Sequence, residues 1–258
     1  MKTYISPAYQ HLVKEFVAAL PSRFETEGTM LYNKRNVVKR FEVNGLTLVV
    51  KRYKVPLWFQ RIDYTWFRPS KALRAYRFAL RLKQLGIDTP EAVACVEVTR
   101  RGLFRQGFFV STECSDPNLK CLVENNPDPD DLFEAYVRFL LEMHEKGFLH
   151  GDLNLSNILY RRQEDGSFHF TVIDTNRSHF VSHPTRCQCL KNLMRIQRNR
   201  AFSRKVVSRY AQLRGWDEEE SVKFVFRQID RYERKRRMRK ISKKVIRQEK
   251  LSNSHVKS

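Results

Sequence analysis

Asp152 and Asn157 lie five residues apart in the segment FLHGDLNLSNILY, and Asp174 follows in the segment VIDTNR. Phosphoryl transfer from a nucleotide requires a carboxylate near the acceptor hydroxyl, oxygen ligands for magnesium and a cation on the phosphates. Magnesium is a hard ion that takes carboxylate and amide oxygens rather than sulfur. A hairpin between Asn157 and Asp174 would bring these oxygens to one wall of a cleft. The three residues therefore predict a phosphotransfer site.

The alternative for this segment is a structural turn, because aspartate also stabilises turns by bonding its own backbone neighbours. Lys51, which precedes the segment in a predicted strand, would be an ordinary surface lysine if it stood alone. The order Lys51, Asp152, Asn157 and Asp174 along the chain favours the catalytic interpretation.

The residues before position 125 predict a β-rich region that positions Lys51. The runs GTMLYN, NVVKRFEV and LTLVVKRYKV are rich in β-branched and aromatic residues, with Asn44-Gly45 at the second connection. Asn-Gly favours a tight hairpin turn, so we expect a three-stranded antiparallel meander. The periodic segment SKALRAYRFALRLK predicts a helix that ends near Gly86. Two more strands are expected at 92–99 and 107–112.

The residues after the polar segment ENNPDPDD predict a mostly helical region. Apolar side chains at helical spacing begin after Asp131, and Gly147 is a typical terminator. The residues RRQEDGS predict a hairpin between Asn157 and Asp174, and further helices follow. We therefore expect an N-lobe over residues 1–125 and a C-lobe over 126–258.

The composition describes partners better than it describes the fold. The chain has 258 residues and a formal charge of +21, which indicates nucleic acid, an anionic membrane surface or a polyanionic substrate. The first residues contain no uninterrupted apolar run typical of a secretory signal. Five cysteines without framework spacing fit a reducing compartment. These features predict a cytosolic protein.

Two motifs carry a resemblance to a known family. HGDLNLSN is similar to the catalytic loop of the protein-kinase-like superfamily, and VIDTNR resembles its magnesium-binding segment. Together with VVKRY, FFVSTE and the segment SKALRAYRFALRLKQLGIDTPEAVA, they resemble the bacterial lipopolysaccharide kinases, which phosphorylate Kdo or heptose in the inner core. The similarity extends over about 28–177.

The resemblance implies an α+β, two-lobed protein-kinase-like fold with a small antiparallel β-rich N-lobe and a mostly helical C-lobe. It implies ATP and Mg as cofactors. Asp152 would act on the proton of the attacking hydroxyl, Asn157 and Asp174 would bind magnesium, and Lys51 would pair with the nucleotide phosphates. His150 would brace the loop. The implied partner is a lipopolysaccharide core glycolipid at the cytosolic face of the bacterial inner membrane, where the protein would be peripheral.

Three departures from the superfamily pattern bear on this interpretation. The connection between the first two strands of the meander is NKRN and lacks glycines, so Lys34, Arg35 and Asn36 are expected to bind phosphate with side-chain donors instead. Asn154 stands where protein kinases usually carry a lysine, which favours a non-protein substrate.

The third departure concerns the partner of Lys51. Active kinases hold the strand lysine with a helix glutamate, but no acid occurs between Tyr64 and Gly86, and Arg77 stands near the expected position. Asp63 or Glu91 could reach Lys51, or a different geometry could hold this lysine, and a degenerate kinase is a further alternative.

Two further segments leave alternatives open. His179, His183, Cys187 and Cys189 are candidate zinc ligands, but Pro184 interrupts them and no Cys-x-x-Cys pair supports a site. The segment 227–250 contains twelve Lys or Arg and three acids, which fits a solvated helix, an anionic-lipid contact or a nucleic-acid contact.

The preferred function is ATP-dependent phosphorylation of a sugar hydroxyl in the lipopolysaccharide inner core. One alternative is a small atypical protein kinase. Another is a non-catalytic kinase-fold module that binds anionic lipid or RNA. Nucleic acid is the less favoured partner because no zinc-finger or aromatic RNA-binding pattern accompanies the basic segment. The oligomeric state is not predicted.

Overall fold

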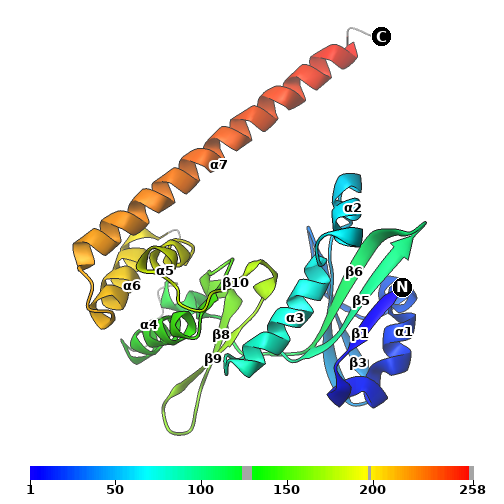
Figure 1. The fold of residues 1–258 in the computed structure, drawn as a ribbon, viewed down its shortest axis with the longest axis horizontal. Coiled ribbons are helices and arrows are strands. Elements are labelled where there is room, and N and C mark those ends of the chain that lie inside the picture. Colours follow the sequence, from blue (N-terminus) through cyan, green and yellow to red (C-terminus); the bar gives the residue numbers. More distant parts are fainter. Residues whose placement is uncertain (124–129, 197–198, 256–258) are drawn as a thin grey trace. The chain divides into compact units, whose positions relative to one another are not determined.

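A computed structural model describes residues 1–123, 130–196 and 199–255 (Figure 1). Their contacts divide into two compact units, one formed by residues 1–135 and 150–180 and the other by 136–149 and 181–258. The predicted lobe boundary between residues 125 and 126 lies outside the described residues and stays a prediction.

The first unit is built on an antiparallel sheet of six strands in the order β1-β5-β6-β4-β3-β2. The strand bounds are β1 Lys2–Ile5, β2 Thr29–Asn33, β3 Val37–Val43, β4 Leu46–Arg52, β5 Ala92–Arg100 and β6 Leu103–Thr112. The predicted meander is confirmed as β2, β3 and β4. Asn44 and Gly45 have φ angles of 48° and 78°, the positive values that a tight hairpin turn requires. The sequence-based prediction missed β1.

Each face of this sheet is covered by a helix. Helix α1, Gln10–Thr26, buries Phe16, Leu20 and Phe24 in one core with Leu48 and Val50 of β4. Helix α3, Lys71–Gln84, packs on the other face with Tyr53 and Cys95. Side chains alternate between the two faces of a strand. Since Leu48 and Val50 face α1, Lys51 lies on the α3 face.

Helix α3 begins and ends as its sequence predicts. Ser70 caps its N-terminus by accepting a hydrogen bond from the Leu73 backbone amide, and Gly86 follows the helix with a φ of 63°. Helix α2, Trp58–Trp66, was not predicted. It contacts β6 through the Arg61 side chain, whose Nε donates to the Phe104 carbonyl at 2.8 Å.

The catalytic-loop segment also belongs to the first unit. Strands β8, Ile158–Arg162, and β9, Phe168–Val172, form the predicted antiparallel hairpin, with Ile158 opposite Val172. Short 3-10 turns occur at η1 Pro7–Tyr9, η2 Leu119–Leu122, η3 Leu155–Asn157 and η4 Thr175–Arg177, and strand β10 is His179–Phe180. The hairpin therefore places η3, which precedes β8, beside the chain that leaves β9.

The second unit is helical. Its elements are the greater part of α4 Asp130–Glu145, the strand β7 Phe148–Leu149, and the helices α5 Arg186–Leu193, α6 Arg200–Leu213 and α7 Glu218–His255. Leu190, Val207, Tyr210 and Val225 are among the side chains buried in it. The predicted basic helix is confirmed within α7, where residues 230–239 are exposed. Within the described part of the chain, no helix is both long and apolar enough to cross a membrane.

Candidate active site

Lys51 and Asp174 form the ion pair at the centre of the site. Lys51 Nζ lies 2.8 Å from Asp174 Oδ1, and the two side chains are 18% and 35% exposed. Burial alone would raise the pKa of Asp174, but the Lys51 ammonium, aided by His150 and Arg177, holds this pKa below its ordinary value. Asp174 is therefore ionised at neutral pH, as a metal ligand must be.

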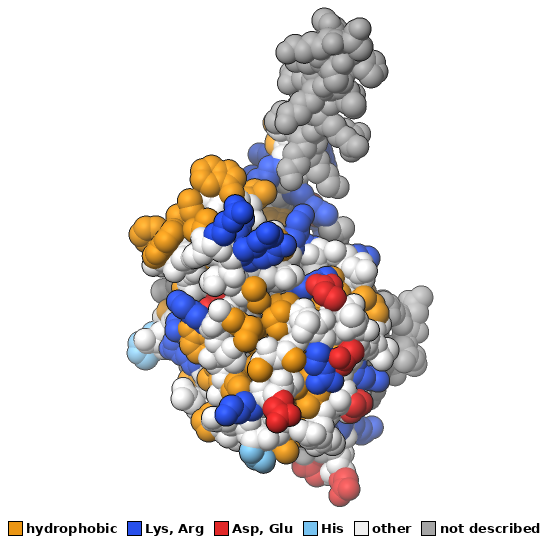
Figure 2. Space-filling view, turned by 90° about the vertical axis from the view of Figure 1, so that its right-hand side faces the viewer, with side chains coloured by type: hydrophobic (Ala, Val, Ile, Leu, Met, Phe, Trp, Pro, Cys, Tyr) orange, Lys and Arg blue, Asp and Glu red, His pale blue; other side chains and the backbone are white. Residues whose placement is uncertain are grey.

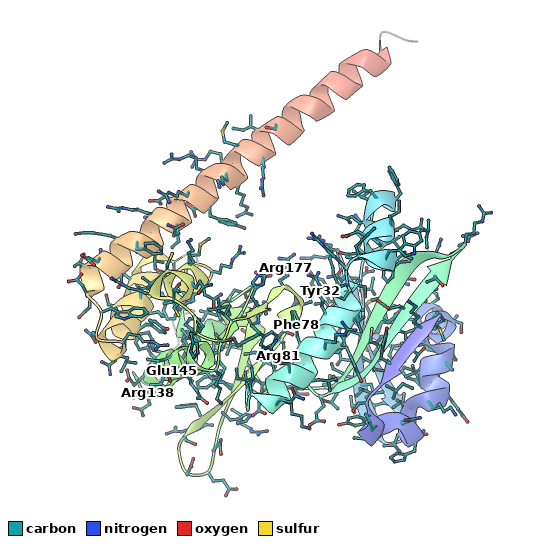
Figure 3. All side chains as sticks on the ribbon, viewed as in Figure 1. Tyr32, Phe78, Arg81, Arg138, Glu145 and Arg177 are labelled. Carbon is teal, nitrogen blue, oxygen red and sulfur yellow. The ribbon has the colours of Figure 1, made fainter. Side chains whose placement is uncertain are left out.

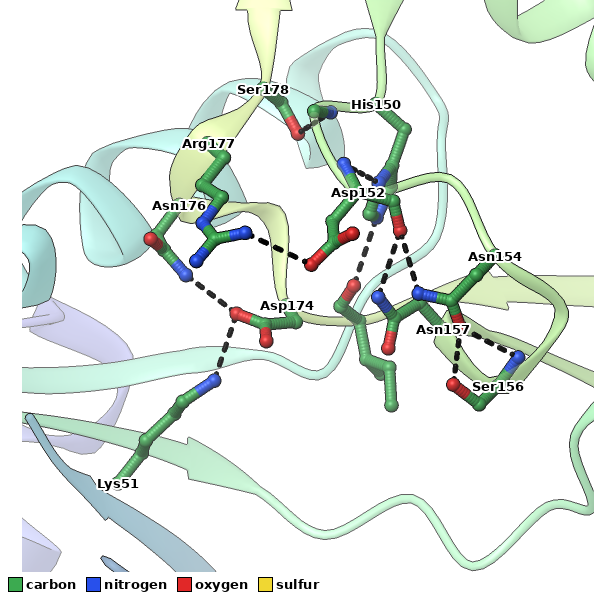
Figure 4. Close-up of polar contacts among 12 residues, drawn as sticks. Lys51, His150, Asp152, Asn154, Ser156, Asn157, Asp174, Asn176, Arg177 and Ser178 are labelled. Atoms are coloured by element: carbon green, nitrogen blue, oxygen red, sulfur yellow. Dashed lines mark hydrogen bonds and ion pairs between the residues drawn. The ribbon is translucent and has the colours of Figure 1, made fainter. Parts of the chain in front are cut away.

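Asp174 has a left-handed backbone, with φ 57° and ψ 45°. Aspartate tolerates this region better than most residues. The Asn176 side-chain amide donates to Asp174 Oδ1 at 2.5 Å, which orients the carboxylate (Figure 4). The chain leaves strand β9 at Val172. The left-handed conformation of Asp174 then directs its carboxylate toward Lys51.

His150 supports the loop that carries Asp152. The Asp152 backbone amide donates to His150 Nδ1 at 3.1 Å, and His150 Nε2 lies 2.9 Å from the Ile173 carbonyl. This pair of contacts requires the tautomer in which Nε2 carries the proton. Burial lowers the pKa of His150, so the ring is neutral at pH 7. The contacts agree with the bracing role predicted for His150.

Asn157 is fixed by the same loop. Its side-chain Nδ2 donates to the Asp152 carbonyl at 2.9 Å, and its own carbonyl accepts from the Ile173 amide at 2.9 Å. Because the nitrogen of the amide is used within the loop, Oδ1 is the end of this side chain suited to bind a cation (Figure 4). The backbone bond keeps Asn157 next to the strand end that carries Asp174.

Asn154 has a structural role in the loop. Its Oδ1 accepts from the Ser156 amide at 3.0 Å and its Nδ2 donates to the Asp152 carbonyl at 3.1 Å. These bonds cap the η3 turn. They account for an asparagine at this position, where protein kinases usually place a lysine.

Gly151 is required by a close backbone approach. A Cβ atom at this position would lie 2.0 Å from the Arg177 carbonyl oxygen, far inside van der Waals contact. The Gly151 amide donates to Ser178 Oγ at 3.2 Å, which joins the two segments (Figure 4). Glycine in place of the arginine of protein kinases thus lets the catalytic loop lie directly against the segment after Asp174.

Arg177 is a site residue that the sequence-based prediction did not single out. Its Nη1 lies 3.3 Å from Asp152 Oδ2, and its side chain is 51% exposed. An arginine three residues after Asp174 is visible in VIDTNR, but only the crossing of the two loops places it on Asp152.

Lys51 pairs with Asp174, which is the different geometry left open beside Asp63 and Glu91. Asp63 pairs with Arg68 at 3.7 Å, and Glu91 pairs with Lys83 and accepts a bond from Tyr9. Asp174 takes the role instead, because it lies on the α3 side of the sheet. Arg77 is exposed.

The predicted phosphate-binding residues Lys34, Arg35 and Asn36 form the turn between β2 and β3. Val38 lies opposite Lys51 in the sheet, so this turn is close to the end of the sheet that carries Lys51. Asn36 Oδ1 accepts from the Lys54 amide at 3.2 Å, which uses its acceptor to hold the turn. Their role in nucleotide binding stays a prediction.

The donor set of the site fits magnesium. The Asp174 carboxylate and the Asn157 amide oxygen are hard ligands, and magnesium usually keeps several waters besides one or two carboxylates. Among the described residues, no three His, Cys, Asp or Glu side chains converge on a common point suited to a metal, and this holds for His179, His183, Cys187 and Cys189. The five cysteines all lie in the described part of the chain, and none of them forms a disulfide.

Comparison with known proteins identifies the fold and then the family. The structure is similar to that of WaaP in complex with acyl carrier protein, with a TM-score of 0.58 and 19% identity over 90% of this chain and 99% of the other, which shows a protein-kinase-like α+β fold. Residues 19–213 match the lipopolysaccharide kinase (Kdo/WaaP) family. The chain belongs to this family, as the motifs predicted.

Individual relatives share only modest sequence identity with this chain. The chain is 29% identical to a 3-deoxy-D-manno-octulosonic acid kinase of Vibrio vulnificus (strain YJ016) over 125 residues, which are 46% of this chain and 52% of that protein. It thus spans about half the length of that relative. It is also 26% identical to the KEOPS complex subunit Bud32 of Pyrococcus abyssi (strain GE5 / Orsay), over 70% of this chain and 79% of that protein.

Proposed function

We propose that the protein transfers the γ-phosphoryl group of ATP to a sugar hydroxyl of the lipopolysaccharide inner core, on Kdo or heptose. The observation that carries this proposal is the joined pair of loops in which Lys51 contacts Asp174 while the Asn157 side-chain amide donates to the Asp152 carbonyl. Family membership and the similarity to a 3-deoxy-D-manno-octulosonic acid (Kdo) kinase support the sugar acceptor.

Each site residue has a different role in the proposed reaction. Asp152 orients the acceptor hydroxyl and takes its proton as the oxygen bonds to the γ-phosphorus and ADP leaves. Lys51 pairs with the nucleotide phosphates, and Asp174 and Asn157 would hold magnesium. Magnesium, when bound, neutralises charge on the phosphate oxygens. His150 and Gly151 act indirectly, by setting the position of Asp152.

The test replaces Asp152 with Asn and measures phosphate transfer from ATP to purified core glycolipid. Since a positioned general base contributes about 10² to 10⁴ in rate, kcat should fall by that factor. Asp165→Asn is the matched control, because Asp165 lies in the β8–β9 turn and bonds only Ser167 among the contacts described for it. Parental activity in Asp152→Asn, with the fold verified by circular dichroism, would refute the proposed base.

The acceptor is tested separately. Mass spectrometry of core oligosaccharide from cells that lack the protein should show the loss of one phosphate. An unchanged oligosaccharide, with phosphate transfer to protein in vitro, would instead support the small protein kinase. Failure to bind nucleotide at all would support the non-catalytic module.

We also propose a peripheral position at an anionic membrane surface, where such a glycolipid would be met. Helix α2 and the residues before it expose a patch of large apolar side chains, which Figure 2 shows at the upper left. Its members are Val55, Leu57, Trp58, Phe59, Trp66 and Phe67, which are 44–78% exposed. Exposed Lys54 and Arg68 flank the patch. Aromatic groups with flanking cations suit the interface of an anionic bilayer.

A further inference from the structure

Helix α3 carries cations where a kinase would carry the glutamate that holds its strand lysine. One stripe of the helix, at spacings of three and four residues, contains Lys71, Arg74, Phe78 and Arg81. Phe78 and Arg81 pack on Phe180, with distances to the ring centre of 5.1 Å and 4.2 Å. Figure 3 shows both extending from α3 toward the segment that carries Arg177.

The same stripe continues toward the Lys51–Asp174 pair. Helix α3 packs against η4, Thr175–Arg177, and Lys71 in its first turn interacts electrostatically with Arg177. Arg74 interacts electrostatically with Tyr53, and Lys51 Nζ lies 5.4 Å from the centre of the Tyr53 ring. Arg74 and Lys51 therefore approach the site from the helix and from the strand.

One hydrogen-bond donor of Arg74 has no partner among the described protein groups. Its Nε is buried and has no hydrogen-bond partner among the residues that the structure describes. A buried donor that lacks a partner destabilises the fold, and more so when the group is charged. Arginine also presents donors in a planar fork that matches carboxylate and phosphate oxygens. The unused donor thus suits an oxyanion.

The cations near Arg74 lie close enough to repel one another. The pKa of Lys71 is lowered, first by partial burial and then by the charges of Arg35, Arg177 and Arg74. Arg177 contacts Asp152 at 3.3 Å, but no acid is described as a partner of Lys71 or Arg74 among the described residues. Like charges such as those of Lys71 and Arg74, for which no acid partner is described, are stabilised by binding an anion.

We propose that Lys71, Arg74 and Arg177 form an oxyanion-binding subsite beside the Lys51–Asp174 pair, with Arg35 at its edge. Its ligand is a carboxylate or phosphate group, carried either by the acceptor sugar or by the nucleotide as its terminal phosphate. The contact of Arg177 with Asp152 places this subsite next to the proposed base. If the ligand is an acidic acceptor sugar, the binding of its anionic group in the subsite would orient the neighbouring hydroxyl of the same sugar.

The first experiment measures binding without turnover. Inorganic phosphate should raise the melting temperature of the parent protein and of Arg77→Gln, and should have little effect on Arg74→Gln or Lys71→Gln. Arg77 is the matched control because it lies on the exposed side of the same helix. This arm is independent of the proposed phosphotransfer, so a protein without kinase activity can still confirm or refute the subsite.

The second experiment identifies the source of the anion and rests on the proposed function. In Arg74→Gln the KM of one substrate should rise about tenfold or more, because a charge-assisted contact is lost. A rise for the glycolipid places the acceptor anion in the subsite, and a rise for ATP places the terminal phosphate there. Arg74→Lys, which keeps the charge, should recover part of the loss.

The outcome that overturns the subsite is equally direct. In that case Arg74→Gln and Lys71→Gln would behave like Arg77→Gln. Phosphate would raise their melting temperatures as much as that of the parent, and both KM values would stay within about twofold of the parent values, although the loss of a charged contact should change them more. Circular dichroism of each variant verifies the fold. If Arg74→Gln does not fold, Lys71→Gln and Arg74→Lys decide the question.

Discussion

At the scale of single residues, the site depends on how closely two loops approach. Gly151 contacts the Arg177 carbonyl so closely that no Cβ fits, and the Asp152 amide and the His150 ring connect the loop to Ile173. These contacts fix the position of Asp152 and do not involve its carboxylate. The position of the carboxylate is therefore sensitive to changes in neighbours that never touch a substrate.

Gly151→Ala tests this sensitivity. The added methyl group must push the Arg177 backbone away, so we expect a loss of about 1–3 kcal/mol in the free energy of unfolding and a large fall in kcat. Gly166→Ala is the control, because an added Cβ there meets no atom within 4 Å and its cost comes only from a φ of 82°. The control should lose stability and keep kcat. Unchanged kcat in Gly151→Ala would show that the loop tolerates the shift.

At the scale of elements, buried polar groups join the helices of the second unit. His144 of α4 lies 2.8 Å from the Tyr210 hydroxyl of α6 through Nδ1, and 3.0 Å from Asn192 Oδ1 of α5 through Nε2. Burial lowers the pKa of His144 to about 4. One neutral imidazole thus links three helices.

This link predicts a loss of stability in acid. A histidine whose folded pKa is below its unfolded value stabilises the fold above about pH 6.5, and this contribution is lost as the pH falls toward 4. We expect up to about 3 kcal/mol from His144 over that interval, measured by chemical unfolding at several pH values. His144→Gln should flatten the pH dependence in part, because His150 also titrates below its ordinary pKa.

The control for that experiment is His183→Gln, since His183 is exposed and should leave the pH dependence as it is. Equal slopes in all three proteins would contradict the assignment to His144.

At the scale of the whole molecule, charge and exposed apolar surface point to the same kind of partner. The formal charge is +21, and α2 contacts β6 through Arg61 while Trp58 and Trp66 face outward, 72% and 65% exposed. Aromatic side chains insert at the headgroup level of a bilayer, whereas cations are attracted to it over a Debye length.

Binding to vesicles tests the membrane proposal. Vesicles that contain anionic phospholipid should bind the protein, and the double variant Trp58→Ser and Trp66→Ser should weaken binding by about tenfold or more. Leu31→Ser is the control, because Leu31 is a similarly exposed apolar residue on β2. Binding should also fall steeply with salt. Equal binding by the double variant and the control would contradict the proposal.

The sequence by itself determined the chemistry and most of the elements. The spacing of Asp152, Asn157 and Asp174, the alternating strands and the periodic helix α3 are local patterns, and the antiparallel meander and the protein-kinase-like family follow from them. Local periodicity and turn residues act over a few positions, so a linear reading captures them.

Only the tertiary structure decided which groups meet. The partner of Lys51 is Asp174 rather than Asp63 or Glu91, and Arg74 of α3 interacts with Tyr53 beside Lys51, whereas Arg77 is exposed. The side chains of a strand alternate between the two faces of its sheet, and those of a helix rotate by about 100° per residue. Which side chains become neighbours is therefore decided only when the strand and the helix pack together. The requirement for Gly151 likewise arises from a segment 26 residues away, whose approach no local pattern predicts.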